Sequence, residues 1–357
     1  YSDLNLETVN AFVISDSYYD MSKSNIDGFA DSVDIIQTYK KKNDAASGPD
    51  IDVTKDTFTV YLSGLDNMGS PDQQTRSDTN LILIVNPKAN HIDMVSLPRD
   101  GYIPNAAYDY KNDKLTHTGN DGIENSVETI QNFFGIPIDY YARVSFNSLI
   151  EIVDTIGGID VDVEIDFCEQ DENRSFKKED LICLKKGKQH LNGKQALAYS
   201  RHRKTKGYDN AGRERAQQRI IKAIINKLIS ANGLTKVNDL MDIAPNYIIT
   251  NMPAEKIADF VSGELNELKP WTISSITSDN GVYEDLYVAS LDPSLGVSNV
   301  YLFSRDEVHA VVNAYDAARR QLQMNSFTFN LNDLYANTPK INTSENIRYA
   351  DMAENPQ

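Results

Sequence analysis

Carboxylate and guanidinium side chains gather at the ends of three predicted strands. Four residues share this placement: Asp66, Arg76, Asp78 and Arg99. Sheets in α/β proteins bind ligands beyond their strand ends, so side chains there can meet around a substrate. A divalent cation such as Mg²⁺ takes one or two carboxylates and completes its shell with phosphate oxygens, while arginine forks bind the remaining phosphate oxygens. Surface ion pairs, which most neighbouring Asp and Arg residues form, are the competing interpretation.

A basic segment, residues 198–219, contrasts with the acidity of the whole chain. It holds seven Lys or Arg against two acidic residues, in a protein whose formal net charge is −17. Arg201 and Arg203 lie two apart after a predicted helix, so in an extended chain their side chains share a face. Arg213 and Gln217 lie four apart, on one face of the next predicted helix. The segment is either a solvated helix surface or one wall of an anion-binding site, and its near-exclusion of acids favours the second.

Other kinds of site are excluded by spacing and composition. Gly64 and Gly69 have the spacing of a phosphate-binding P-loop, but Ser70 and Pro71 stand where that loop needs Lys and Ser or Thr. No GxGxxG or nucleophile elbow follows a predicted strand, and no HExxH or CxxC pattern indicates zinc. Strong acidity argues against a nucleic-acid or anionic-membrane surface, and the longest apolar runs are the size of strands.

The elements that must position these residues alternate between strands and helices. Apolar runs predict strands at 56–66, 79–87, 90–100, 139–146, 159–165, 271–277 and 298–303. Periodicity predicts helices at 124–135, 147–158, 192–201, 212–231, 253–267 and 305–323. Asn147 is the predicted N-cap of the second helix. We expect an α/β fold with a mixed central β-sheet flanked by helices.

The sequence is similar to the LytR-CpsA-Psr (LCP) family in eight short segments, which occur in the family's order and approximate spacing. They are SGLD, RSDTNLILIVNP, VSLPRD, DKLTH, YYARVSF, IVDTIGGIDVDV, LNGKQALAYSRHR and GRERAQQR. The similarity runs from about Thr57 to Ser230. It implies a catalytic domain of α/β/α layers over residues 56–323, with the core motifs at 57–230. Residues 1–55 would be a membrane-proximal or accessory region with a linker, and residues 324–357 a C-terminal tail.

The resemblance implies an extracytoplasmic phosphotransferase of Gram-positive envelopes, anchored by a transmembrane helix upstream of this sequence. Such an enzyme moves a glycopolymer, a teichoic acid or capsule polysaccharide, from a polyprenyl-pyrophosphate carrier to peptidoglycan through a phosphodiester. By motif, Asp66 and Asp78 would hold Mg²⁺ or Mn²⁺ beside the pyrophosphate. The implied phosphate-binding residues are Arg76, Arg99, Arg201, Arg203, Arg213 and Gln217. The implied catalytic residues are Asp66, Asp78, Arg99, Arg201 and Arg203.

Two features depart from the family pattern. Ala216 stands where an arginine is common, which would remove one phosphate or polymer contact. The polar excursion at 166–188, which holds Cys168 and Cys183, has no match in the pattern. Spacing alone fits a disulfide and two free thiols equally, but the extracellular setting that the resemblance implies favours the disulfide.

Two other functions stay open. A hydrolase could use the same site with water as the acceptor, and a non-catalytic envelope-binding protein could share the fold. The intact acidic and arginine residues disfavour the second, because a binding protein tolerates their loss. A lipid carrier also needs an apolar surface, for which the candidates are Phe133, Phe134, Leu149, Ile150 and Val153. Such residues more commonly belong to the core.

Overall fold

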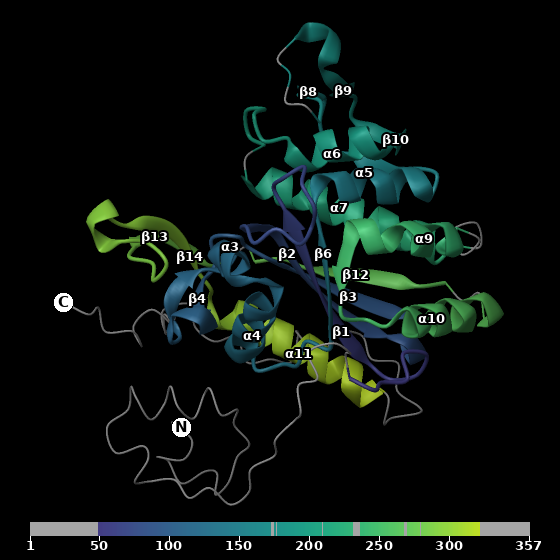
Figure 1. Cartoon of the computed structure of the whole chain (residues 1–357), viewed down its shortest axis with the longest axis horizontal. Helices are drawn as coiled ribbons and strands as arrows, with labels where there is room; N and C mark the ends of the chain where they lie inside the picture. The colour runs from purple at the N-terminus through teal and green to yellow at the C-terminus, as the bar shows by residue number, and fades with distance from the viewer. Residues whose placement is uncertain are drawn as a thin grey trace, which may run out of the picture.

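A computed structural model describes residues 49–172, 175, 177–208, 210–230, 236–267, 270–278 and 280–321 of the 357-residue chain. Its centre is a β-sheet (Figure 1). The sheet has six strands in the order β11-β6-β1-β2-β3-β12. The strands are β1 (Phe58–Leu65), β2 (Ser77–Asn86), β3 (His91–Leu97), β6 (Tyr140–Val144), β11 (Ile248–Thr250) and β12 (Thr272–Ile276). The β1–β6 and β3–β12 pairs are parallel and the other pairs are antiparallel. The prediction of a mixed central sheet is confirmed.

Helices and small two-stranded pairs surround this sheet. The helices are α3 (Leu115–Thr118), α4 (Ile123–Phe134), α5 (Phe146–Thr155), α6 (Gly193–Arg201), α7 (Asn210–Leu228), α9 (Val237–Tyr247), α10 (Ala254–Glu267) and α11 (Arg305–Gln321). The small pairs are β4 (Tyr102–Asn105) with β5 (Lys111–Lys114), β7 (Ile159–Val163) with β10 (Gly187–Leu191), β8 (Phe167–Glu169) with β9 (Ile182–Leu184), and β13 (Val282–Leu286) with β14 (Ser298–Leu302).

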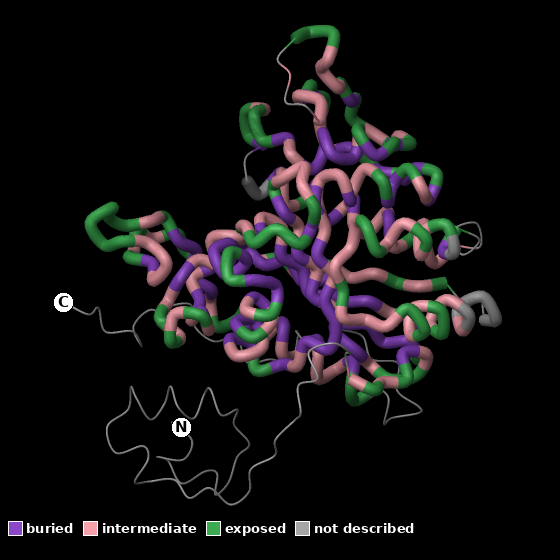
Figure 2. The backbone as a smooth tube through the Cα atoms, viewed as in Figure 1, coloured by how far each residue is buried: buried purple, intermediate pink, exposed green. Residues whose placement is uncertain are grey.

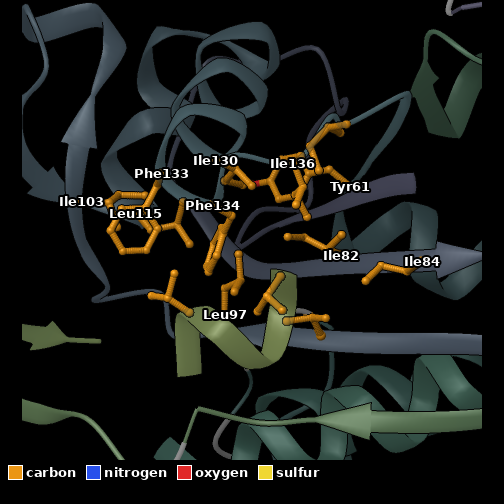
Figure 3. Packing of buried hydrophobic residues seen from close by; sticks show 14 of the residues in the cluster. Tyr61, Ile82, Ile84, Leu97, Ile103, Leu115, Ile130, Phe133, Phe134 and Ile136 are labelled. Atoms are coloured by element: carbon orange, nitrogen blue, oxygen red, sulfur yellow. The ribbon is translucent and has the colours of Figure 1, made fainter. Parts of the chain in front are cut away.

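The helices α4 and α11 cover one face of the sheet, below the strands in Figure 1. Alternate strand residues, among them Tyr61, Ile82 and Ile84, contribute to this layer, and Phe133 and Phe134 meet them from α4 (Figure 3). The two phenylalanines pack edge to face with ring centroids 4.8 Å apart. Both are buried. They are core residues, which is the commoner of the two roles that the sequence allowed.

The helix α7 separates two further apolar clusters on the opposite side of the sheet. Its residues Ile221 and Ile225 pack toward the sheet, in the cluster that contains Leu81. Its residues Ile220 and Ile224 pack instead into the cluster formed with α5, α6 and β7. The helix therefore buries two adjacent rows of side chains, each with a spacing of four. The buried residues concentrate along the central strands and the inner sides of these helices (Figure 2).

Local differences from the predicted elements have identifiable causes. Ser145, not Asn147, is the N-cap of α5, because Ser145 and Ser148 exchange side-chain and backbone hydrogen bonds as a capping box. The side chain of Asn147 donates instead to the carbonyl oxygen of Met68. The strand β5 has the sequence KNDK, which carries no apolar alternation, and it exists because it pairs with β4.

The predicted accessory region at 1–55 and the tail at 324–357 lie almost entirely outside the described residues. Residues 49–55 are described, and Val53 is buried in the same cluster as Phe58. The packed unit therefore begins before the predicted boundary at residue 56. Within the part of the chain that the structure describes, we find no helix with the length and apolar character that a membrane crossing requires.

Candidate functional site

One edge of the central sheet gathers the strand ends that carry the predicted residues. The strands β1, β3 and β6 end there and β2 begins there. The register between β1 and β2 shifts at this edge: Gly64 pairs with Thr79, but Leu65 pairs with Ser77. Asp78 is therefore the extra residue of a β-bulge, a feature that interrupts side-chain alternation and re-aims a side chain at a strand end.

Asp78 is held by two partners at this edge. Its Oδ1 lies 2.8 Å from Nη1 of Arg99 and accepts a hydrogen bond of 3.0 Å from Oγ1 of Thr116. The backbone N–H of Thr116 donates to the carbonyl oxygen of Arg99 at 2.8 Å. The three residues thus form a closed set of contacts that joins the ends of β2 and β3 to α3. Sequence reasoning missed Thr116, although it lies within the DKLTH segment.

Arg213, near the N-terminus of α7, lies within electrostatic reach of this set. Burial lowers the pKa of its guanidinium, and the positive charges of Arg99 and Arg203 lower it further, whereas Asp78 acts in the opposite direction. Its Nε is buried and has no hydrogen-bond partner. An unpaired buried donor costs about 1–3 kcal/mol, and a helix N-terminus adds positive potential. This part of the molecule therefore has the electrostatics of an anion-binding site.

Arg201 reaches the same edge through Phe146. Its guanidinium lies over the Phe146 ring, 5.3 Å from the centroid. The backbone N–H of Phe146 donates to the carbonyl oxygen of Asn67 at 2.9 Å, and Asn67 directly follows the exposed Asp66. The loop after β1, the start of α5 and the end of α6 therefore meet. Phe146 was also missed, although it ends the YYARVSF segment.

The basic segment, residues 198–219, divides into two sets of residues. One set lies on a solvated helix surface and the other lies toward the candidate anion-binding site. Arg215 and Arg219 both pair with Glu164, at 3.1 and 3.4 Å, so these two are surface ion pairs. Gln217 lies on the other side of the same helix turn, where its Nε2 donates to the carbonyl oxygen of Ser200 at 3.3 Å. This contact ties α7 to α6, whose last residue is Arg201.

Ala216 is completely buried beside Ile220 and Ile224 in the cluster under α6. The side chain at this position therefore packs into the core. An arginine here would have to leave that cluster to reach an anion. The alanine is therefore explained by its packing.

Arg143 is a buried residue of β6 that sequence reasoning also missed. Its Nη2 donates to the carbonyl oxygens of Thr75 at 2.8 Å and Gly119 at 3.1 Å, and burial lowers the pKa of its guanidinium. Gly119 approaches this loop so closely that an added Cβ would lie 2.6 Å from the oxygen of Thr75. Arg143 therefore fixes the loop that carries Arg76, which is itself exposed. An arginine within a short, otherwise mostly apolar strand was the available signal.

Cys168 and Cys183 form a disulfide, as the resemblance predicts. They lie opposite each other in the β8–β9 pair, with Cα atoms 4.0 Å apart. The hairpin projects beyond α6 at the top of Figure 1. By restricting the unfolded chain, a cross-link over a loop of this length stabilises by about 3 kcal/mol. Elsewhere, within the described ranges, no three or more His, Cys, Asp or Glu side chains are grouped as a metal site.

Comparisons with known proteins identify the family of this chain. The profile of the LytR_cpsA_psr family matches residues 21–293. TagV of Bacillus subtilis strain 168 is 31% identical over 268 residues, which are 72% of this chain and 62% of TagV. TagU of the same organism is 34% identical over 234 residues, 64% of this chain and 72% of TagU. Both are named polyisoprenyl-teichoic acid–peptidoglycan teichoic acid transferases.

The crystal structure of B. subtilis TagV has the same layered fold. It superposes with a TM-score of 0.59 at 27% identity, covering 76% of this chain and 99% of the crystallised one. The present chain therefore matches nearly all of the crystallised part of TagV, but less than two thirds of the full TagV sequence.

Proposed function

Because the chain belongs to the LytR-CpsA-Psr family, we propose that it transfers a glycopolymer from a polyprenyl-pyrophosphate carrier to peptidoglycan through a phosphodiester bond. The names of TagV and TagU support a teichoic acid as the polymer. One observation carries the proposal: the buried Nε of Arg213 has no hydrogen-bond partner, although Arg99, Arg203 and Asp78 lie close by. A pyrophosphate supplies both the acceptor oxygens and the negative charge that this cluster lacks.

Arginine side chains suit a reaction whose main requirements are positioning and charge neutralisation. An acceptor hydroxyl oxygen forms a bond to the phosphorus that carries the polymer. The bond from that phosphorus to the bridging oxygen breaks, and polyprenyl phosphate leaves with the electron pair. The hydroxyl proton is lost to a base or to water. Arg99, Arg201 and Arg213 bind the phosphate oxygens, and removing one such donor typically costs about 10²–10³ in rate.

Mg²⁺ or Mn²⁺ is part of the proposal, with Asp66 and Asp78 as protein ligands. Both contacts of Asp78 described above use Oδ1, which leaves Oδ2 as the candidate ligand. Asp66 follows the Leu65–Ser77 pair and so lies at the same sheet edge. Two carboxylates suit a hard cation that takes its remaining ligands from water and phosphate. When bound, the cation would neutralise charge on the pyrophosphate.

We also propose that the protein acts at the extracytoplasmic face of the membrane, anchored by a transmembrane helix upstream of this sequence. A lipid-linked donor and a peptidoglycan acceptor meet at that face. The Cys168–Cys183 disulfide supports this location, because disulfides persist in oxidising compartments and are rare in the cytosol. In a chain with a net charge of −17, the positive charge gathered at the arginine-rich edge favours the approach of an anionic head group to this edge.

The experiment is to incubate the protein with a polyprenyl-pyrophosphate glycan, peptidoglycan fragments and Mg²⁺, and to analyse the products by mass spectrometry. We expect a conjugate joined by one phosphate, and its loss in Arg213→Ala. Release of a phosphorylated glycan without conjugate would indicate a hydrolase. Donor binding without any product would indicate a non-catalytic binding protein.

A further inference from the structure

The residue between Arg201 and Arg203 is a buried histidine. The ring of His202 stacks on Phe167 with centroids 4.3 Å apart, and its Nδ1 lies 3.0 Å from Oε2 of Glu169. Both partners in this ion-pair geometry are nearly inaccessible, with side chains 3% and 6% exposed. Because His202 is buried and contacted in this way, its side chain is held in one position. Arg201 and Arg203 are its neighbours along the chain.

The same imidazole is fixed from its other side. Its Nε2 lies 2.8 Å from Oγ1 of Thr205, and the Tyr208 ring stacks on it at 5.7 Å. Residues 202–204 follow the end of α6 without forming helix or strand. Side-chain contacts, rather than a helix or a strand ladder, therefore fix the backbone between the two arginines.

The strand β8 supplies the contacts on the first side of the ring, although it is only three residues long. Phe167 stacks on the histidine ring, Cys168 is cross-linked to β9, and Glu169 contacts the histidine. Two residues further on, the carbonyl oxygen of Asp171 accepts a hydrogen bond of 3.2 Å from Nη1 of Arg201. The hairpin thus touches both His202 and the guanidinium of a predicted phosphate-binding residue.

We propose that Glu169 and His202 are positioning residues, which hold Arg201 and Arg203 in place for the pyrophosphate. This inference rests on the proposed function of the arginine cluster. A nearby cation also faces Glu169, since Nζ of Lys204 lies 4.0 Å from its Oε1. The excursion at 166–188, which departs from the family pattern, therefore has a role in this chain. It orients part of the anion-binding site, and the disulfide cross-links the two strands of the excursion.

Four variants test the inference. Glu169→Gln keeps an acceptor for the imidazole N–H and is the conservative variant, whereas Glu169→Ala removes it. The double variant E169L/H202F removes both polar groups but keeps an aromatic ring against Phe167, and apolar replacement of a buried pair is often neutral for stability. Asp160→Ala is the matched control, because it breaks a His–Asp contact of 2.8 Å with His190 that is largely exposed.

The measurements are the affinity for inorganic pyrophosphate with Mg²⁺, by calorimetry, and the thermal midpoint. We expect Glu169→Ala and E169L/H202F to weaken binding by about tenfold or more, since small misplacements of a binding group have effects of this order or larger. Glu169→Gln and Asp160→Ala should bind like the wild type. A purely structural pair would change the thermal midpoint and leave the affinity of the folded protein unchanged.

Two results would overturn the inference. One is wild-type affinity in a stable E169L/H202F variant. The other is that Glu169→Ala binds pyrophosphate as tightly as Glu169→Gln does. This second result decides the question if E169L/H202F does not fold. Arg201→Ala distinguishes failure of this inference from failure of the proposed function. If it also leaves pyrophosphate affinity unchanged, the arginine cluster is not the pyrophosphate site and the proposed function fails with the inference.

Discussion

The two halves of the arginine cluster are supported by different kinds of structure. Asp78 and Arg99 lie at strand ends, where the register of β1, β2 and β3 sets their place. Arg201 ends α6 and Arg203 lies two residues further on, and a cross-linked hairpin fixes the chain between them. The first half is positioned by a sheet that many residues stabilise. The second depends on a few side chains, so the halves should respond differently to the same treatment.

The largest effect should come from the half that the sheet positions. Arg99→Ala removes a phosphate donor and the partner of Asp78, so we expect kcat/KM for transfer to fall by about 10²–10³. Arg201→Ala should also lower kcat/KM, because it removes a phosphate donor from the other half of the cluster. The thermal midpoint should change little in both variants, because these guanidiniums lie at element ends and outside the apolar clusters.

Arg219→Ala is the matched control, because this arginine belongs to the same basic segment but pairs with Glu164. It should retain activity. The comparison would break if Arg99→Ala clearly lowered the thermal midpoint and kept its activity, since that result describes a structural ion pair.

The next largest effect concerns the cation. Asp66→Ala and Asp78→Asn should each remove most metal-dependent turnover while leaving pyrophosphate binding, which the arginines sustain. Two carboxylates at one edge repel each other, so Mg²⁺ should bind weakly alone and better with pyrophosphate, whose oxygens complete its shell. The measurement is turnover against Mg²⁺ concentration, with a chelator control. Full activity in chelator would mean that these carboxylates only orient the arginines.

The half of the cluster at the strand ends, Asp78 and Arg99, could be predicted from sequence far better than the half beside the hairpin, Arg201 and Arg203. Apolar runs located five of the six central strands and missed the three-residue strand β11. Asp78 and Arg99 stood beside the located strands, so their meeting at one edge followed from the sheet itself. The contact between Glu169 and His202 joins residues 33 apart. It depends on where a hairpin without apolar periodicity folds back, and no local pattern encodes that. Arg143 was missed for a related reason, because its partners are backbone carbonyls of a loop residue, Thr75, and of Gly119, which begins a 3-10 turn.

A smaller effect should follow reduction of the hairpin. Opening the Cys168–Cys183 bond should weaken pyrophosphate binding severalfold, because it loosens the chain around β8, where Glu169 contacts His202 and Asp171 contacts Arg201. The effect of Arg99→Ala should persist in reductant. The measurement pairs calorimetry with intact mass after alkylation, and a C168S/C183S variant should show no response to reductant. Two alkylated thiols without reductant would contradict the disulfide, and unchanged affinity after complete reduction would separate the hairpin from binding.

The smallest effect should appear in the central sheet at alkaline pH. Burial, followed by the charge of Glu124, raises the pKa of Tyr141 on β6 to about 12, and its hydroxyl donates to Glu124 at 3.1 Å. An unfolded tyrosine has a pKa near 10, so the folded state retains the proton more strongly. The resulting stability is fully present below about pH 10 and is lost as pH rises toward 12. Tyr141→Phe should cost about 1 kcal/mol at neutral pH but show a smaller fall in thermal midpoint between pH 9 and 11. Tyr110→Phe, which breaks a more exposed hydrogen bond from Tyr110 to Glu128 on the same helix, is the matched control. If both variants and the wild type lose stability in parallel over this range, Tyr141 does not couple the sheet to pH.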